Sequence, residues 1–127
     1  MSSRNMRRKK ILAVDDSQTI LLVERAILGP RFDVTTASSG EEGLGCATAD
    51  PPDLVLVDLE MPGINGFETC RRLRSSPLTS ETPIILVTSH SEGEALEGAF
   101  LHGCTDYVIK PIDGDELLLK VSSYLGE

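Results

Sequence analysis

The chain has 127 residues, of which 40% are hydrophobic, so it is long enough to bury one core and too short for two ordinary domains. Its net charge of −8 disfavours binding of nucleic acid or an anionic membrane by the folded body. No apolar run approaches the roughly eighteen residues that span a bilayer, and no signal-peptide pattern follows the charged N-terminus. We therefore expect a cytoplasmic protein.

The basic residues are concentrated at the N-terminus. Five of the twelve lysines and arginines lie in residues 1–10, so residues 11–127 carry seven basic and twenty acidic residues, a net charge of −13. A nucleic-acid or membrane tether is one interpretation of this segment, but a short solvated tail is the favoured one. We predict a flexible basic tail at residues 1–9 and a single domain at residues 10–127.

Five short segments predict β-strands. Four are continuous apolar runs, which are typical of strands covered on both faces, as in a parallel sheet. The fifth segment has one strongly apolar residue among β-forming residues and suits an edge strand. In chain order, the predicted strands are Ile11–Val14, the edge strand Asp33–Ala37, Leu54–Val57, Ile84–Val87 and Tyr107–Ile109.

Segments with helical periodicity separate the predicted strands. The first, around Ile20–Ile27, is ended by Gly29-Pro30. We expect Gly103 to end the fourth helix and the fifth to cover Glu116–Leu125, where Leu119 lies off the core stripe and is either exposed or packed under a loop. Four helix starts have a small polar residue three positions before a glutamate, a pattern that caps helices. These pairs are Ser39 with Glu42, Asn65 with Glu68, Ser91 with Glu94, and Asp113 with Glu116.

The alternation of strands and helices predicts an α/β fold. Five strand–helix units in one short chain imply an open, doubly wound parallel sheet, because right-handed crossovers place helices on both of its faces. Periodicity alone leaves the order of the strands in the sheet open.

The cysteines give no sign of a metal site or a disulfide framework. Cys46, Cys70 and Cys104 are odd in number, far apart in sequence and without a C-x-x-C pair, and only two histidines could complete a metal set. We interpret them as reduced, mostly packed thiols.

Polar residues follow four of the five predicted strands. Asp15 and Asp16 follow the first strand, Asp58 the third, Thr88 the fourth, and Lys110 the fifth. In a doubly wound sheet these positions share the edge where ligands bind. Three crowded carboxylates repel one another, and a shared Mg²⁺ (or Mn²⁺) is the usual remedy. Asp58 could then attack phosphorus in line, while the lysine and the hydroxyl contact phosphoryl oxygens.

Each of these residues also has a plainer interpretation. Asp16 with Ser17 could be only the cap of the first helix, Lys110-Pro111 an ordinary turn, and Thr88 a satisfied hydroxyl at a strand end. Independent turn residues have no reason to supply three acids, a hydroxyl and a lysine along one edge. The joint pattern therefore favours a phosphoryl and metal site.

The sequence resembles the receiver domain of two-component signalling from about Lys9 to Leu125. This resemblance implies a flavodoxin-like fold with strand order 2-1-3-4-5 and a domain that takes up a phosphoryl group and reports it by changing shape. Four motifs in order carry it: Val14-Asp15-Asp16-Ser17, Asp58-Leu59-Glu60-Met61-Pro62-Gly63-Ile64-Asn65-Gly66, Val87-Thr88-Ser89, and Asp106-Tyr107-Val108-Ile109-Lys110-Pro111.

The resemblance also implies a role for each matching residue. It makes the domain a signalling protein that catalyses its own phosphorylation and slow dephosphorylation rather than a metabolic enzyme. The implied roles are phosphoacceptor for Asp58, metal ligands for Asp15, Asp16, Asp58 and the backbone carbonyl of Glu60, phosphoryl contacts for Thr88 and Lys110, switching aromatic for Tyr107, and a cis peptide for Lys110-Pro111.

The partners that the resemblance implies are proteins. A histidine kinase or a histidine phosphotransfer protein would donate the phosphoryl group, and an output protein or a fused output domain would receive the signal. No direct contact with nucleic acid or membrane is expected, and a phosphorylation-dependent homodimer is a further expectation. The sequence does not decide between a stand-alone receiver and one cut from a longer chain.

Small departures and rival families leave this interpretation in place. Ser89 replaces a common alanine, and Glu60 and His90 occupy variable positions where phosphoryl lifetime is tuned, although His90 could equally be an ordinary exposed histidine. An aspartyl phosphatase of the haloacid-dehalogenase kind would have D-x-D or D-x-T after the first strand. A receiver-like module that is never phosphorylated would lack an acid, the lysine or the threonine, and a flavodoxin would have a hydroxyl-rich phosphate loop.

Overall fold

A computed structural model describes residues 7–89 and 93–127, and strands alternate with helices along the chain. The elements are β1 (Lys10–Val14), α1 (Gln18–Leu28), β2 (Asp33–Ala37), α2 (Gly40–Ala49), β3 (Leu54–Asp58), α3 (Gly66–Ser75), β4 (Ile84–Thr88), α4 (Gly93–Leu101), β5 (Asp106–Ile109) and α5 (Gly114–Leu125).

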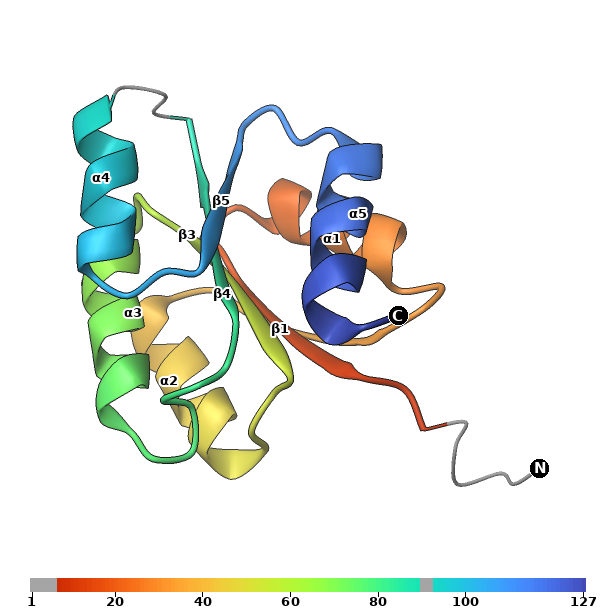
Figure 1. The fold of residues 1–127 in the computed structure, drawn as a ribbon, viewed down its shortest axis with the longest axis horizontal. Coiled ribbons are helices and arrows are strands. Elements are labelled where there is room, and N and C mark those ends of the chain that lie inside the picture. The colour runs from red at the N-terminus through yellow and green to blue at the C-terminus, as the bar shows by residue number, and fades with distance from the viewer. Residues whose placement is uncertain (1–6, 90–92) are drawn as a thin grey trace.

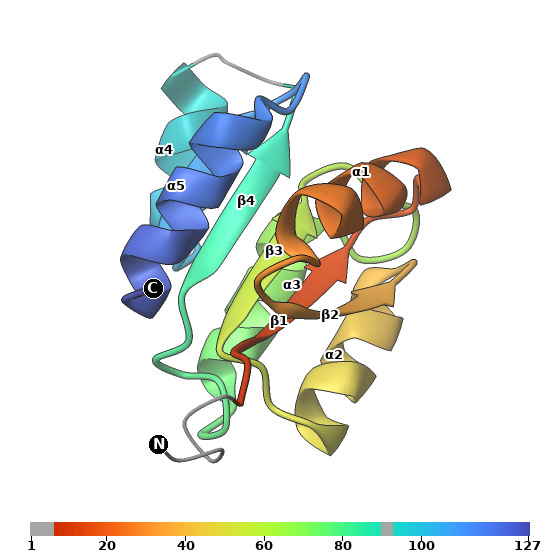
Figure 2. The ribbon, with the colours of Figure 1, turned by 90° about the vertical axis from the view of Figure 1, so that its right-hand side faces the viewer.

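The five strands form one parallel sheet in the order β2-β1-β3-β4-β5. Helices α1 and α5 cover one face of this sheet, and α2, α3 and α4 cover the other (Figure 1). The arrows of β1 and β4 point toward the same end of the molecule (Figure 2). The doubly wound α/β fold and the order 2-1-3-4-5 are therefore confirmed, as is the edge position of Asp33–Ala37.

The strands and the first and fifth helices begin and end within two residues of their predicted bounds. Asp58 and Thr88 are the last residues of β3 and β4 rather than the first residues after them. Helix α5 begins at Gly114, two residues before the predicted start, because the Asp113 side chain accepts hydrogen bonds from the backbone N–H groups of Asp115 and Glu116. The predicted cap is thus correct, and the helix simply begins directly after it.

Polar caps also begin α1, α2 and α3. Ser17, Ser39 and Asn65 each accept a hydrogen bond from the backbone N–H three residues later. The predicted cap Ser91 lies outside the described residues. After α4, Gly103 has φ +94°, the left-handed region that favours glycine, which confirms it as the stop of that helix.

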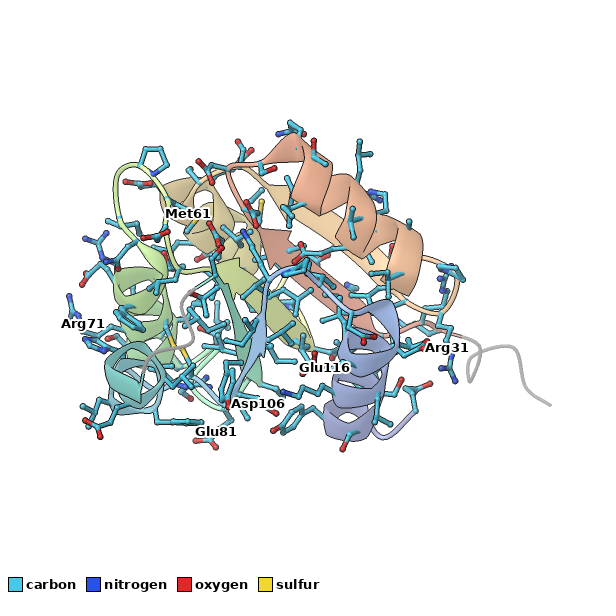
Figure 3. All side chains as sticks on the ribbon, turned by 90° about the horizontal axis from the view of Figure 1, so that it is seen from above. Arg31, Met61, Arg71, Glu81, Asp106 and Glu116 are labelled. Atoms are coloured by element: carbon cyan, nitrogen blue, oxygen red, sulfur yellow. The ribbon has the colours of Figure 1, made fainter. Side chains whose placement is uncertain are left out.

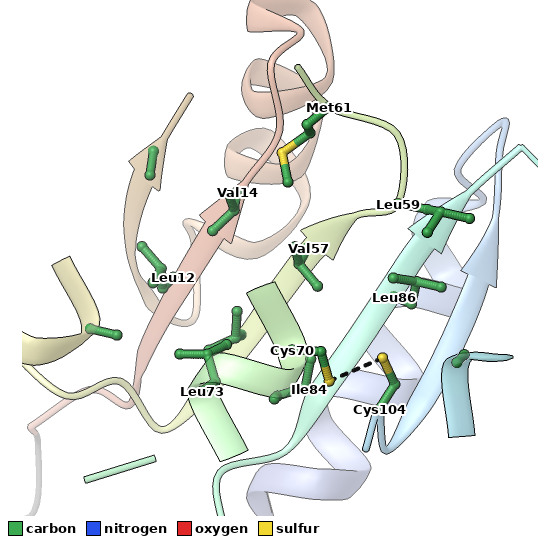
Figure 4. Close-up of a cluster of buried hydrophobic side chains, with 14 residues drawn as sticks. Leu12, Val14, Val57, Leu59, Met61, Cys70, Leu73, Ile84, Leu86 and Cys104 are labelled. Carbon is green, nitrogen blue, oxygen red and sulfur yellow. Dashed lines mark hydrogen bonds between the residues drawn. The ribbon is translucent and has the colours of Figure 1, made fainter. Parts of the chain in front are cut away.

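Two apolar layers flank the sheet. The layer under α2, α3 and α4 contains Leu12, Val57, Leu73 and Leu86 (Figure 4). The layer under α1 and α5 contains Ile11, Ala13, Leu21, Leu28, Phe32, Val34, Leu54, Leu56, Ile85, Val87, Val108, Leu117 and Val121. Because successive strand residues point to opposite faces, β1, β3 and β4 supply both layers, which explains their continuous hydrophobicity.

The remaining predictions about the fold concern single residues. Leu119 is 71% exposed, so the exposed alternative holds. All three cysteines are free thiols, with Cys70 and Cys104 buried and Cys46 partly buried, as predicted. Most of the predicted tail lies outside the described residues, while the Arg8 guanidinium donates to backbone carbonyls of the α1–β2 loop. Among the described residues, no helix is long and apolar enough to cross a membrane.

Candidate functional site

The three aspartates that follow β1 and end β3 meet at the carboxyl edge of the sheet. β1 pairs with β3 in a register that aligns Val14 with Val57, so the residues that come next lie side by side. One carboxylate oxygen from each of Asp15, Asp16 and Asp58 lies within 4.8 Å of the others. Asp15 and Asp58 are buried and Asp16 is exposed, so the cluster is open to solvent on one side.

Lys110 brings a positive charge into this cluster. Its Nζ donates a hydrogen bond to Asp58 Oδ1 at 2.9 Å and lies 3.4 Å from Asp15 Oδ2. Its backbone N–H donates to the Thr88 carbonyl at 2.7 Å, and its peptide bond to Pro111 is cis. Burial lowers the pKa of Lys110, but the hydrogen bond to Asp58 and the charges of Asp15 and Asp58 outweigh it and raise that pKa.

The carboxylates are not fully compensated by this lysine. Burial raises the pKa of Asp58, the hydrogen bond from Lys110 lowers it, and the neighbouring Asp15 raises it further, with a net upward shift. Asp15 Oδ1 accepts a hydrogen bond from the Ser17 N–H at 2.9 Å, whereas its buried Oδ2 has no hydrogen-bond partner. A buried carboxylate oxygen without a hydrogen bond, beside two further carboxylates, is a donor set that suits a hard divalent cation.

Glu24 of α1 is a buried acidic residue that the sequence interpretation overlooked. It is 1% exposed, its Oε1 has no hydrogen-bond partner, and burial, followed by the charge of Asp15, raises its pKa to about 8. It shares a helix face with Leu21 and Leu28, which are three residues before it and four after it. That spacing was visible in the sequence and could have identified it.

Thr88 and Tyr107 lie on neighbouring strands. Thr88 is buried, and the register aligns Leu86 with Tyr107 and Thr88 with Ile109. The Tyr107 ring is partly buried and meets the ring of Phe100 edge to face, with the ring centroids 6.3 Å apart. The β3–β4 register aligns Asp58 with Val87 and so brings the following Thr88 to the acidic cluster, whereas the contact with Phe100 leaves Tyr107 on the side of β5 that faces α4.

A second polar network joins β5 to α5. Lys120 Nζ donates to the Tyr107 carbonyl at 2.6 Å, lies 5.0 Å from the centre of the Tyr107 ring and contacts Asp106. Burial raises the pKa of Asp106, but hydrogen bonds from the Tyr107 N–H, the Tyr124 hydroxyl and Lys120 outweigh it and lower that pKa. Figure 3 shows Asp106 and Glu116 on this side of the molecule, away from Met61.

Helix α3 begins in direct contact with the end of β3. The Gly66 N–H donates to the Leu59 carbonyl at 2.8 Å, and a Cβ at position 66 would lie 2.5 Å from the Asp58 carbonyl oxygen and 2.8 Å from Leu59 Cα. Only glycine leaves room for this approach, which fixes the backbone that carries the Asp58 side chain.

The other predicted site residues lie around the rim. Glu60 is exposed in a surface hollow of about 550 Å³ next to Asp58 that Phe67 also lines. Ser89 is exposed, and His90 lies outside the described residues. His102, directly after α4, stacks on the Phe67 ring with the centroids 4.7 Å apart.

This geometry can be set beside known proteins. The sequence matches the family described as "Response regulator receiver domain" over residues 11–122. The chain belongs to this family. The response regulator PleD of Caulobacter vibrioides is 36% identical to this receiver domain over 116 residues, which cover 90% of this chain and 25% of PleD. The receiver domain thus spans about a quarter of that relative.

Other similar proteins are about as long as this chain. Protein PilH of Pseudomonas aeruginosa is 36% identical over 118 residues, covering 92% of this chain and 98% of PilH. Among solved structures, the chemotaxis protein CheY4 of Vibrio cholerae superposes with a TM-score of 0.89 at 29% identity, covering 93% of this chain and 99% of CheY4. Receiver domains of this size therefore occur both alone and within longer proteins.

Proposed function

We propose that this receiver domain accepts a phosphoryl group on Asp58 from the phosphohistidine of a kinase or a histidine phosphotransfer protein. The observation that carries the proposal is the contact of Lys110 Nζ with Asp58 Oδ1 at 2.9 Å beside two further aspartates. A lone buried carboxylate would be costly, and a structural ion pair would need only one of them. Three carboxylates and one lysine at a strand edge suit transfer of a phosphoryl group.

In this proposal, Asp15, Asp16 and Asp58 hold a divalent cation, Mg²⁺ or Mn²⁺, with the backbone carbonyl of Glu60. The buried Asp15 Oδ2, which lacks a hydrogen bond, supports this ligand set. When bound, the ion neutralises charge on the transferring phosphoryl oxygens. The repulsion from Asp15 and Asp16, which helps to raise the pKa of Asp58, would be relieved when the three carboxylates share that charge.

The residues of the chain then divide the work of transfer. A carboxylate oxygen of Asp58 forms the new bond to phosphorus while the bond from phosphorus to the donor imidazole breaks, and the imidazole keeps that electron pair. Lys110 already contacts Asp58 and can pass to a phosphoryl oxygen without moving far. Thr88, buried at the end of the neighbouring strand, can donate its hydroxyl to the same group.

The experiment is phosphorylation by a small phosphodonor in the presence of Mg²⁺. We expect one phosphoryl group by intact mass, stable in acid, labile in base and released by hydroxylamine. Asp58→Asn should lower the rate at least ~100-fold, as expected when the nucleophile of a transfer step is removed. The exposed Asp53→Asn at the opposite edge should match the wild type. If Asp58→Asn accepts the label at the wild-type rate, the assignment is wrong.

The signal is proposed to leave through Thr88 and Tyr107. A phosphoryl group that draws the Thr88 hydroxyl inward vacates space that the Tyr107 ring can enter, which changes the face of α4, β5 and α5 where Leu119 is exposed. Beryllofluoride with Mg²⁺ should perturb amide signals along this face, and Thr88→Ala should weaken that response without abolishing binding. Changes confined to the Asp58 pocket would make the domain a phosphoryl relay. An output protein, an output domain or a second receiver is the expected partner of this face.

A further inference from the structure

Two cysteines that are far apart in the sequence are adjacent in the structure. Cys70 lies in α3 and Cys104 lies between α4 and β5, yet their Sγ atoms are 3.2 Å apart, with the Cys104 thiol donating to Cys70 (Figure 4). They are 0% and 5% exposed. Any reaction between them would therefore join two segments separated by one complete strand and helix.

Arg74 fixes the Cys104 segment against α3. Arg74 lies one turn after Cys70. Its Nε donates to the Gly103 carbonyl at 2.9 Å and its Nη2 to Thr105 Oγ1 at 3.2 Å, so it binds the residues on both sides of Cys104. The remaining guanidinium nitrogen donates to carbonyls of the α3–β4 loop. The two thiols are thus held together by contacts that do not involve sulfur.

The same environment makes the two sulfurs unequal. The hydrogen bond from Cys104 lowers the pKa of Cys70, burial raises it, and the charge of Arg74 lowers it further, with a net downward shift. Donating that hydrogen bond, together with burial, raises the pKa of Cys104. Cys70 is therefore the more acidic of the two thiols, and we expect it to react first, with Cys104 following.

We propose that Cys70 and Cys104 form a dithiol site that small disulfides of the glutathione class oxidise to an intramolecular disulfide. The Cys70 thiolate attacks one sulfur of the small disulfide, whose S–S bond breaks and releases a thiolate that takes up a proton. Cys104 then loses its proton and attacks Cys70, which releases the second small thiol. The protein loses two protons and two electrons, and the small disulfide takes them up to become two thiols.

The geometry favours this outcome over a stable mixed disulfide. A disulfide bond is about 2.0 Å long, so the sulfurs must approach by only about 1 Å. Cys70 is 0% exposed, so a glutathionyl group can occupy it only while the packing of α3 is locally open, and closure of that packing favours its displacement by Cys104. Cys46 is a natural contrast, because it is partly exposed on α2 and has neither sulfur as a hydrogen-bond partner.

The test uses Cys46→Ser, in which only the paired thiols remain. Equilibrated with oxidised glutathione at neutral pH and quenched in acid, it should lose the mass of two hydrogen atoms and yield a peptide that links Cys70 to Cys104. Reduction with dithiothreitol should reverse both changes. Because the bond closes a long loop, Tm should rise on the order of 10 °C.

Two matched variants decide the assignment. Adding Cys70→Ala or Cys104→Ala to Cys46→Ser should abolish the mass loss, and a thermal melt shows that each variant is folded. The proposal is overturned if both thiols of Cys46→Ser stay free at equilibrium, or if glutathionyl groups accumulate on Cys70 and Cys104 without a link between them. Neither result depends on phosphorylation of Asp58.

Discussion

The two edges of the sheet differ in the burial of their charged residues, which are near solvent and paired at the amino edge but mostly buried at the carboxyl edge. At the amino edge, Lys10 Nζ pairs with Asp50 Oδ1 at 2.7 Å, and the Lys10 N–H donates to Asp53 Oδ2 at 2.7 Å, all near solvent. At the carboxyl edge, Asp15 and Glu24 are buried, and each has a carboxylate oxygen without a hydrogen bond. Lys110 offsets only part of the cost of burying these acidic groups, as is expected of an edge that serves the proposed phosphoryl site rather than folding.

Among the charged residues at the two edges, Glu24 should have the largest effect on the free energy of unfolding. Its folded-state pKa, about 8, lies above its ordinary value of 4.5, so the unfolded chain ionises first. The free energy of unfolding should therefore fall as the pH rises from 4.5 to about 8 and then level off. Glu24→Gln should remove this dependence and be more stable than the wild type at pH 8 by on the order of 4 kcal/mol.

Urea denaturation at about pH 5 and about pH 8, on either side of most of this titration, measures the difference between the two proteins. Glu97→Gln, on the exposed surface of α4, is the matched control and should follow the wild type at both values. Identical pH dependence of Glu24→Gln and the wild type would show that the buried carboxyl carries no such cost.

Replacing Asp16 should affect Mg²⁺ binding but hardly affect the stability of the metal-free protein. It is the exposed member of the acidic cluster, so Asp16→Ala should weaken Mg²⁺ binding by about tenfold or more, whereas the metal-free stability should change by less than about 0.5 kcal/mol. Calorimetric titration and thermal melts measure the two quantities, with Asp50→Ala as the control that leaves Mg²⁺ affinity unchanged. A clear fall in metal-free Tm would identify Asp16 as a structural cap.

The buried carboxylate of Asp58 should also lower the stability of the metal-free protein, but by less than that of Glu24. Because burial raises its pKa, against the opposing hydrogen bond from Lys110, ionising Asp58 costs more in the folded protein than in the unfolded chain. The amide oxygen introduced by Asp58→Asn can still accept the Lys110 hydrogen bond, so we expect the metal-free variant to gain about 1 kcal/mol in stability. Chemical denaturation without Mg²⁺ checks this, and a loss of stability would mean that the Lys110 ion pair outweighs the burial.

Removing a charge at the amino edge should hardly change the stability of the protein. The Asp50 carboxylate is 63% exposed, and solvent screens its pairing with Lys10. Asp50→Asn should therefore cost no more than about 0.5 kcal/mol, and added salt should diminish even that difference. A loss above about 1 kcal/mol, the upper end for exposed ion pairs, would erase the contrast between the edges.

Much of this molecule was predictable because its signals are local. Continuous apolar runs marked the strands, and the polar residues that follow them placed Asp15, Asp58 and Lys110 on one edge, because parallel strands end together. The cost of Glu24 and the contact between Cys70 and Cys104 were not predicted. The spacing of Glu24 with Leu21 and Leu28 marks it for burial, but its approach to Asp15 and the contact of Cys70 with Cys104 depend on how separate segments pack, which periodicity does not encode.

The close contact of Gly66 with the end of β3 has a consequence for mutations at this position. Its hydrogen atom faces the Asp58 carbonyl where any larger group would collide, although glycine itself has no chemistry to offer. Codon 66 should therefore tolerate as little change as the codon for the proposed phosphoryl acceptor. A screen for loss-of-signalling alleles would find both, and only the refolding behaviour of the products would tell the damaged scaffold from the missing nucleophile.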